Sequence, residues 1–341
     1  MLCTPVGGNT MRIGINGFGR VGRVFLRIAL ERGYDVAAVN DITDAATMAH
    51  LFAHDSTYGP LGREVSYSDD SLIVDGRKIR YTGEKDPKLL DWGGLGVDLV
   101  IESTGRFRSR ELAAAHLAAG ARKVLLSAPA KGPVDATVVM GINQSVYDPE
   151  QHDVVSNASC TTNCVAPMVD VLHRHFGLVH GFMTTIHGYT QDQQLLDGPH
   201  KDLRRARAAA VNIIPTSTGA AKSVGLVIPE TAGLLDGIAV RVPVPTGSMV
   251  DLAAVLRRPA SAAEVNAAFE AEAADRLHGY LKVTDLPMVS SDVVGDPASC
   301  VLDSALTQAD GDLVKVFGWY DNEWGYTSRL ADLAAYVGAR L

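Results

Sequence analysis

The chain has 341 residues, of which 47% are hydrophobic and 21% charged, with a formal net charge of −8. This composition is that of a globular protein long enough for two domains, and it argues against disorder. The acidic balance, without any block of like charge, excludes a general affinity for nucleic acid or for a membrane surface. No apolar run is long enough to span a bilayer. Four cysteines are too few for a disulfide framework and are typical of a reducing cytosol, so we expect a cytoplasmic protein.

The first half of the chain alternates between strand and helix patterns. Residues 1–10 do not have the charged start and apolar stretch of a secretory signal, so we expect a short N-terminal extension. The residues after it predict strands at 11–16, 34–41, 97–104 and 123–128, helices at 19–33, 48–55 and 110–120, and a hairpin at 72–81. Such alternation predicts an α/β domain with a parallel sheet covered on both faces.

After Cys160 the pattern changes to longer strands with few helices between them. A helix at 164–177 is followed by predicted strands at 179–188, 237–245, 249–258 and 312–320, and the chain closes on an amphipathic helix at 324–341. This order predicts a second, α+β domain whose sheet is mostly antiparallel.

A glycine-rich loop directly follows the first predicted strand. Gly17, Gly19 and Gly22 have the G-x-G-x-x-G spacing at a helix start, where free N–H groups and the helix dipole can hold a pyrophosphate. Such a triplet alone could simply be turn glycines. Here Asp41 ends the second strand, where an acid can bind ribose hydroxyls and repel a 2′-phosphate. We therefore predict a Rossmann domain that binds NAD rather than NADP.

The stretch SNASCTTNC contains a candidate nucleophile. Cys160 lies between a predicted strand and a helix, where we expect the helix N-terminus to lower the thiol pKa. His187, at the end of a strand, is the candidate base. Cys164 lies one turn further along and is interpreted as a core thiol. A zinc site with His173 and His175 is disfavoured because no second close pair of cysteines exists, so we predict no metal.

Three stretches of the second half favour anion binding. Thr190 follows His187 closely, and Thr218 and Gly219 precede a helix start. Arg205 lies in LRRAR, which could equally be a solvated basic face, whereas Arg241 interrupts an apolar strand and needs a partner there. Together they predict one or two phosphate sites near the thiol.

Eight motifs give the chain a family resemblance. From Met11 onward it resembles phosphorylating glyceraldehyde-3-phosphate dehydrogenases through INGFGRVGR, ND-x-TD, ESTGRF, SNASCTTNC, HKDLRRARAAA, IIPTSTGAAK, VRVPVPTG and WYDNEWGY. The resemblance implies a Rossmann domain at 11–159 plus 322–341, to which the C-terminal helix returns, and a catalytic domain at 160–321. It also implies a homotetramer, with the loop at 189–212 near a neighbouring subunit's cofactor.

The resemblance further implies roles for individual residues. Cys160 would be the nucleophile and His187 its base, with Ser159 and Thr161 flanking the thiol in the substrate site. Thr190 and Arg241 would hold the substrate phosphate. The remaining roles are inorganic-phosphate binding by Arg205, Thr218 and Gly219, and NAD binding by Gly17, Gly19, Arg20, Val21, Gly22, Asp41, Lys85, Ser127 and Asn322.

The implied activity is oxidation of D-glyceraldehyde 3-phosphate to 1,3-bisphosphoglycerate with NAD+ and inorganic phosphate, through a cysteine hemithioacetal and thioester, in glycolysis or gluconeogenesis. Four alternatives stay open: an erythrose-4-phosphate dehydrogenase, a non-phosphorylating NADP-dependent enzyme, a non-catalytic binding protein, and a paralogue with altered inhibitor sensitivity. The last is prompted by Gly188, Leu286 and Gly318, where relatives often carry other residues.

Overall fold

The computed structural model describes residues 11–341, so the predicted extension at 1–10 lies outside the described residues. The chain divides into two compact units. Unit 1 comprises the residues up to Ala136 with 147–157 and 330–341, and unit 2 comprises 137–146 and 158–329. Within residues 11–341, no helix is long and apolar enough to cross a membrane.

Unit 1 is built on a sheet with the strand order β10-β11-β9-β8-β1-β2-β7-β6-β5. The strands from β11 to β7 in this order pair in parallel, and β5, β6 and β7 form antiparallel pairs, which confirms the predicted parallel sheet and the hairpin. The strand bounds are β1 Arg12–Asn16, β2 Asp35–Asn40, β5 Val65–Ser68, β6 Ser71–Val74, β7 Arg77–Thr82, β8 Leu99–Glu102, β9 Lys123–Leu126, β10 Ala136–Thr137 and β11 Val154–Ser156, with a separate pair β3 His54–Asp55 and β4 Gly59–Pro60.

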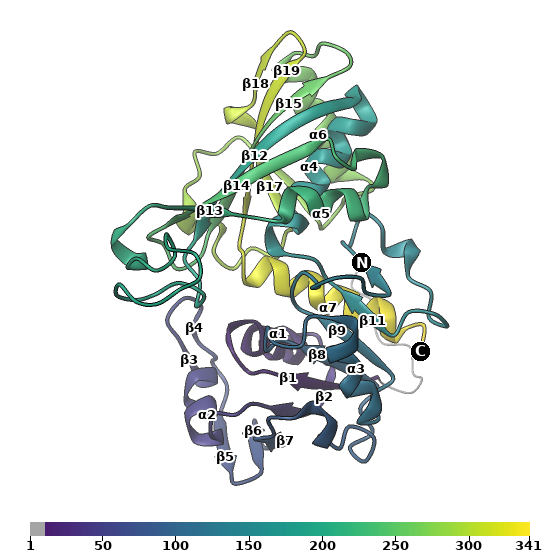
Figure 1. Cartoon of the computed structure of the whole chain (residues 1–341), viewed down its shortest axis with the longest axis vertical. Coiled ribbons are helices and arrows are strands. Elements are labelled where there is room, and N and C mark those ends of the chain that lie inside the picture. The colour runs from purple at the N-terminus through teal and green to yellow at the C-terminus, as the bar shows by residue number, and fades with distance from the viewer. Residues whose placement is uncertain (1–10) are drawn as a thin grey trace. The chain divides into compact units, whose positions relative to one another are not determined.

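Three helices of this unit each follow a parallel strand in the chain. They are α1 Arg20–Glu31, α2 Ala45–Ala53 and α3 Arg110–Ala118, and Figure 1 shows them around strands β1, β2 and β8. Helix α2 begins three residues before the predicted start at Met48, because the Asp44 side chain accepts a hydrogen bond from the Thr47 N–H and caps the helix there.

Unit 2 contains a second sheet, with the strand order β13-β14-β12-β15-β19-β17-β16 and β18 beside β19. Most neighbours are antiparallel, as predicted, while β12 pairs with β14 and β16 with β17 in parallel. The strand bounds are β12 Leu178–Gly188, β13 Ile214–Ser217, β14 Leu235–Val242, β15 Ser248–Leu256, β16 Leu281–Thr284, β17 Cys300–Asp303, β18 Gln308–Asp310 and β19 Leu313–Tyr320.

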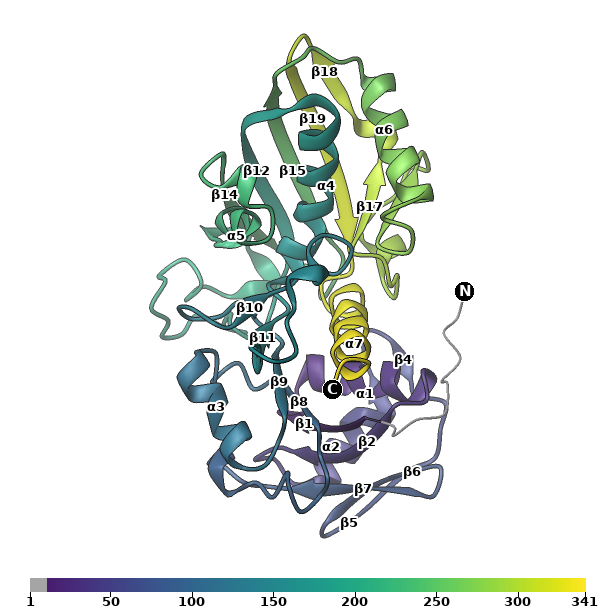
Figure 2. The same cartoon turned by 90° about the vertical axis from the view of Figure 1, so that its right-hand side faces the viewer.

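Helix α4, Cys160–Phe176, lies along one face of β12, β15 and β19 (Figure 2). Val165, Met168 and Leu172 of this helix pack into a buried core with Val250 and Val316 of the strands. This packing holds the start of α4 in place against the sheet. The other helices are α5 Ala220–Val227, α6 Ala262–Ala274 and α7 Trp324–Gly338, and the short 3-10 helices are η1 Pro87–Leu89, η2 Gln144–Val146, η3 Ala209–Val211, η4 Pro229–Thr231, η5 Ser290–Val293 and η6 Ser304–Leu306.

Candidate active site

The glycine loop of unit 1 has the geometry that a bound pyrophosphate requires. Gly17 has φ 94°, and Gly22 packs so closely on Gly17 that a Cβ would collide with the Gly17 carbonyl oxygen. A Cβ on Gly19 would meet nothing within 4 Å, so the backbone there is open to a ligand. Gly19 is also the N-cap of α1 and makes no side-chain cap hydrogen bond, so the backbone N–H groups of the first turn can serve a phosphate.

Asp41 follows β2 beside this loop. Its Oδ2 accepts a hydrogen bond from the Phe18 N–H at 2.7 Å, and its Oδ1 accepts one from the Thr43 N–H at 2.9 Å. These bonds fix a carboxylate next to the glycine loop, with acceptor capacity remaining for ribose hydroxyls. The residues of unit 1 therefore fit a dinucleotide with an unphosphorylated adenosine ribose.

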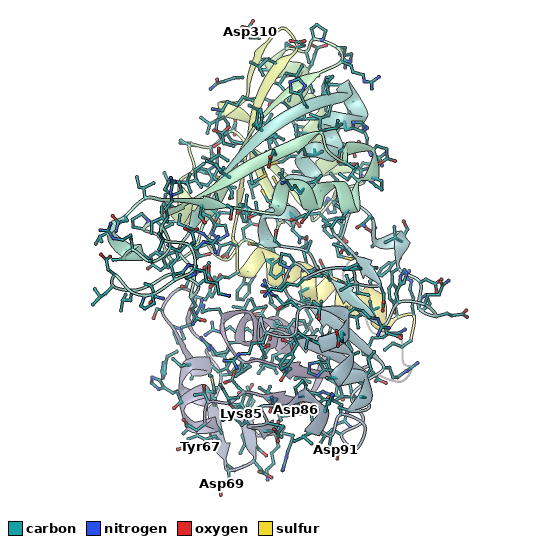
Figure 3. The ribbon with its side chains drawn as sticks, in the orientation of Figure 1. Tyr67, Asp69, Lys85, Asp86, Asp91 and Asp310 are labelled. Carbon is teal, nitrogen blue, oxygen red and sulfur yellow. The ribbon has the colours of Figure 1, made fainter. Side chains whose placement is uncertain are left out.

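The other predicted cofactor residues of unit 1 are placed less directly. The guanidinium of Arg20 pairs with Asp55 at 2.5 Å, so a contact with a pyrophosphate would use the backbone N–H groups of Arg20 and Val21 at the start of α1. Lys85 is exposed on the loop after β7 (Figure 3). Ser127 is half-buried and donates its N–H to the Glu102 carbonyl oxygen.

In unit 2, a strained turn places Cys160 at the first position of α4. Ala158 has φ 54°, a left-handed conformation that costs a residue with a Cβ about 1–2 kcal/mol. The Tyr326 hydroxyl donates a hydrogen bond to the Ala158 carbonyl oxygen at 3.1 Å. Ser159 is the N-cap and accepts a hydrogen bond from the Thr162 N–H at 2.9 Å. The helix therefore starts four residues earlier than predicted, with the thiol at its N-terminus.

The structure brings His187 to the thiol. Its Nε2 lies 3.4 Å from Cys160 Sγ, and its Nδ1 lies 2.6 Å from the Gly188 carbonyl oxygen. An Arg241 nitrogen also approaches, 2.8 Å from Nδ1 and 3.0 Å from the same oxygen. Since a carbonyl oxygen can only accept, the shorter contact favours a proton on Nδ1. Nε2 is then the acceptor that faces the sulfur.

Burial and nearby arginines control the ionisation of this pair. The packed surroundings of the sulfur raise the pKa of Cys160, while the positive charge of Arg241 and the N–H groups at the helix start act to lower it. Burial and Arg241 lower the pKa of His187 to about 3. The expected net depression of the Cys160 pKa by the helix terminus is therefore wrong, because desolvation outweighs it. At neutral pH the imidazole is uncharged and can accept a proton.

Tyr320 is a residue of this site that the sequence did not reveal. Its hydroxyl lies 2.9 Å from Thr161 Oγ1 and 2.8 Å from Thr185 Oγ1, and its ring packs edge-on against His187 with centroids 6.0 Å apart. It therefore joins the first turn of α4 to the strand that carries the base. A buried tyrosine at the end of a strand gave no separate signal in the sequence.

Asn322 is connected to the same site through Ser248. The Gly188 N–H donates to Ser248 Oγ at 3.1 Å, and Ser248 Oγ donates to Asn322 Oδ1 at 2.7 Å. Thr246 also donates to this oxygen, so the amide orientation is fixed with Nδ2 on the opposite side. The Nδ2 group of Asn322 is thus a hydrogen-bond donor in a fixed position. It could bind the amide group of a cofactor.

The predicted anion residues are brought together only in part. Arg241 pairs in register with His187 across β12 and β14, and its Nε is buried with no hydrogen-bond partner in the described part of the chain. Arg205 binds the Thr216 hydroxyl at 2.9 Å and the Ser217 carbonyl oxygen at 3.2 Å, next to Thr218 and Gly219 at the start of α5.

Two acids of this group gave no signal in the sequence. Asp192 forms an ion pair with Arg205, and Asp202 accepts a hydrogen bond from Thr216 Oγ1 at 2.5 Å. Thr190 lies on the same loop as Asp192, and its N–H donates a hydrogen bond to Gln193 Oε1 at 3.3 Å. An anion binding at Arg205 would therefore compete with Asp192.

Cys164 has the core position predicted for it. It is fully buried, and its thiol donates a hydrogen bond to the Gly318 carbonyl oxygen at 3.5 Å. Gly318 leaves room here for three buried sulfurs, since a Cβ at this glycine would lie 2.6 Å from Cys300 Sγ, 2.7 Å from Met168 Sδ and 3.2 Å from Cys164 Sγ.

Comparison with known proteins agrees with this geometry. Residues 11–110 match the family model for the glyceraldehyde 3-phosphate dehydrogenase NAD binding domain, and residues 159–322 match the model for its C-terminal domain. Glyceraldehyde-3-phosphate dehydrogenases of Streptomyces coelicolor, Mycobacterium avium and Geobacillus stearothermophilus are 58%, 56% and 55% identical to it over 97% of this chain, and over 100%, 100% and 99% of their own lengths. The chain therefore belongs to the glyceraldehyde-3-phosphate dehydrogenase family.

Proposed function

We propose that the chain converts D-glyceraldehyde 3-phosphate, NAD+ and inorganic phosphate to 1,3-bisphosphoglycerate and NADH. The observation that carries this proposal is the 3.4 Å contact between Cys160 Sγ, at a helix N-terminus, and His187 Nε2. A thiol and a base in this geometry can form a covalent acyl intermediate. Two arginines beside them can hold anionic groups of the reactants.

The first half of the reaction uses the thiol and the imidazole in turn. His187 takes the thiol proton as Cys160 Sγ adds to the aldehyde carbon, and the proton then passes to the new oxyanion to give a hemithioacetal. When bound, NAD+ supplies the acceptor for the hydride on that carbon. Nε2 takes the hydroxyl proton in the same step, which leaves a thioester on the sulfur. The N–H of Cys160 at the helix start can stabilise the developing oxygen charge.

The second half replaces sulfur by phosphate. A phosphate oxygen attacks the thioester carbon, the carbon–sulfur bond breaks, and His187 returns its proton to the sulfur. We assign Thr190 and Arg241 to the substrate phosphate, since the buried Arg241 Nε needs an acceptor. We assign Arg205, Thr218 and Gly219 to inorganic phosphate, which would displace Asp192 from Arg205. Ser159 caps α4 and Thr161 anchors it to Tyr320, so both hold the thiol in position.

A further set of residues is proposed to bind the cofactor. The residues proposed to bind NAD are Gly17, Gly19, Arg20, Val21, Gly22, Asp41, Lys85, Ser127 and Asn322. Asp41 favours NAD over NADP because its carboxylate would repel a 2′-phosphate.

We also propose that the protein is a cytoplasmic homotetramer. The loop at 189–212 exposes three leucines, with Leu195, Leu196 and Leu203 each at least 76% accessible to solvent. Several exposed leucines on one loop are typical of a surface that a second subunit covers.

A steady-state assay tests the proposed reaction. Purified protein is supplied with glyceraldehyde 3-phosphate while NAD+, NADP+ and phosphate are varied separately, with erythrose 4-phosphate as the competing aldehyde. We expect turnover that requires both NAD+ and inorganic phosphate. Turnover that is independent of phosphate, faster with NADP+, or faster with erythrose 4-phosphate would reject the proposal in favour of one of the alternatives.

A further inference from the structure

Three neighbouring strands of unit 1 end on buried polar residues. Asn16 is the last residue of β1, Asn40 of β2 and Glu102 of β8, and none is more than 4% exposed. Each directly precedes a loop at the carboxyl edge of the parallel sheet: the glycine loop, the segment that contains Asp41, and the loop that begins at Ser103. Ligands of doubly wound sheets bind at this edge.

The Glu102 carboxylate is surrounded by donors. Its Oε2 accepts from Asn16 Nδ2 at 2.6 Å and contacts His116 Nε2 at 3.0 Å. Its Oε1 accepts from the Thr104 N–H at 2.8 Å and from the Thr104 hydroxyl at 2.5 Å. A group that only accepts satisfies all four partners, and an amide in its place would turn an NH₂ group toward two of them.

Trp92 determines the state of His116. The indole Nε1–H can only donate, and it lies 3.0 Å from His116 Nδ1. Nδ1 is therefore an acceptor, and the ring carries its proton on Nε2, which donates to Glu102. Both Trp92 and His116 are fully buried, and neither lies in a cofactor loop. Together they hold the Nε2 donor against the Glu102 carboxylate, and both lie outside the loops.

The chain of bonds continues across the sheet edge. Asn40 Nδ2 donates to Asn16 Oδ1 at 2.8 Å, and Asn40 Oδ1 accepts from Thr82 Oγ1 at 2.7 Å. Between the loops themselves, the Ser103 hydroxyl donates to the Gly17 carbonyl oxygen at 2.6 Å. The loop that begins at Ser103 therefore contacts both the backbone of the glycine loop, through Ser103, and the Glu102 carboxylate, through Thr104.

We propose that Glu102, held by His116 and Trp92, is a positioning residue for the dinucleotide. It fixes the ends of β1, β2 and β8 so that the pyrophosphate and ribose loops have their binding conformation before NAD+ arrives. The gain is affinity, because a preorganised site does not pay the entropy of ordering its loops during binding. This inference rests on the proposed function, since it takes NAD+ as the ligand.

Two substitutions of His116 separate positioning from packing. In His116→Gln the amide nitrogen can occupy the place of Nε2 and still donate to Glu102, whereas in His116→Asn the amide occupies the place of Nδ1 and that bond is lost. Isothermal titration calorimetry of the full chain measures the NAD+ dissociation constant of each variant. A thermal unfolding curve shows whether both variants are folded at the titration temperature. We expect a roughly tenfold weaker NAD+ affinity for H116N, from one lost hydrogen bond to a charged group.

For H116Q we expect an affinity within about threefold of the unsubstituted chain, because the donor is retained. Equal affinities for H116N and the unsubstituted chain, with a lowered melting temperature alone, would overturn the positioning role. Failure of the unsubstituted chain to bind NAD+ would instead reject the cofactor assignment, so the two failures are distinguishable.

Trp92→Phe tests the indole contact separately. Phenylalanine keeps an aromatic ring at this position but cannot donate to His116 Nδ1, so the imidazole is no longer held in the tautomer that donates to Glu102. We expect a weaker NAD+ affinity for W92F than for the unsubstituted chain. Equal affinities of the two proteins would contradict the proposal. Should H116N fail to fold, the W92F titration decides.

Discussion

Cys160 and His187 are both in surroundings that disfavour their charged forms, the thiolate and the imidazolium. Burial raises the pKa of the thiol and lowers that of the imidazole, and Arg241 is the cation that acts on both. The charge of Arg241 favours the thiolate and disfavours the imidazolium. Arg241 donates to the Gly188 carbonyl oxygen at 3.0 Å, which holds its charge 2.8 Å from His187 Nδ1 and lets it influence the protonation of the pair as well as its geometry.

Removal of that charge should make the thiol less reactive. In Arg241→Gln the attraction that lowers the Cys160 pKa is lost, so we expect the midpoint for alkylation of Cys160 by iodoacetamide to move to higher pH. Arg207→Gln is the matched control, because Arg207 pairs with Asp197 on the surface and is not among the groups that shift the Cys160 pKa. Coincident alkylation profiles for R241Q and the unsubstituted protein would show that Arg241 does not influence the thiol.

His187→Asn tests the role of the imidazole as base. Asparagine cannot accept the proton of the thiol or of the hemithioacetal, so we expect kcat to fall by about 10²- to 10⁴-fold. The alkylation midpoint of Cys160 should rise as well, since the acceptor 3.4 Å from the sulfur is removed. Stopped-flow measurement of NADH formation gives the first quantity. A variant with kcat within threefold of the original would exclude His187 as the base.

At the scale of elements, the start of α4 decides where the thiol lies. Ser159 caps the helix through the Thr162 N–H, and the strained Ala158 turns the chain into it. Loss of an N-cap side chain costs about 1 kcal/mol of stability and frees the first turn. The position of Cys160 at the first helical residue therefore depends on one hydroxyl.

Ser159→Ala should lower both stability and thiol reactivity. Ser261→Ala is the control, because Ser261 caps α6 through the Glu264 N–H at 3.2 Å and is remote in sequence from the thiol. We expect similar losses of about 1 kcal/mol for both in urea unfolding, and a slower alkylation of Cys160 only in S159A. If S159A reacts at the original rate, the cap stabilises the helix without positioning the sulfur.

At the scale of the whole molecule, we expect the exposed leucines of the loop at 189–212 to contact a neighbouring subunit. Replacement of Leu195 and Leu196 by serine should shift the sedimentation of the protein toward smaller species, because the apolar contact that we assign to a neighbouring subunit is lost. Leu89→Ser is the control, since Leu89 is 70% exposed in unit 1 and lies outside the loop. A single unchanged tetramer peak for the double variant would place the subunit contact elsewhere.

The sequence predicted what local patterns encode and little of what distant residues build together. The glycine loop, the two kinds of sheet and the site of Cys160 follow from spacing and hydrophobic periodicity. The contact of Tyr320 with Thr161 joins residues 159 positions apart, and that of Glu102 with Asn16 joins residues 86 positions apart. No periodicity records such pairs, because they arise only when strands become neighbours in a sheet.

Electrostatic detail was also beyond local patterns. The helix N-terminus indicated a lowered Cys160 pKa, but the desolvation that opposes it comes from side chains packed around the sulfur from several elements. Likewise, the sequence predicts that Arg205 binds a phosphate, whereas in the structure Arg205 pairs with Asp192, thirteen residues earlier in the chain. The reactive residue can therefore be identified from the sequence, but the direction of its pKa shift can be determined only from the packed structure.

A single turnover without phosphate tests the central claim, that the sulfur of Cys160 forms the covalent intermediate. The protein is mixed with glyceraldehyde 3-phosphate and excess NAD+ in phosphate-free buffer, quenched with acid, and analysed for NADH and for the mass of the peptide that contains Cys160. We expect one NADH per subunit and a 3-phosphoglyceryl group on Cys160, with neither in Cys160→Ser. A full burst in the serine variant, or an acyl group on another residue, would contradict the account.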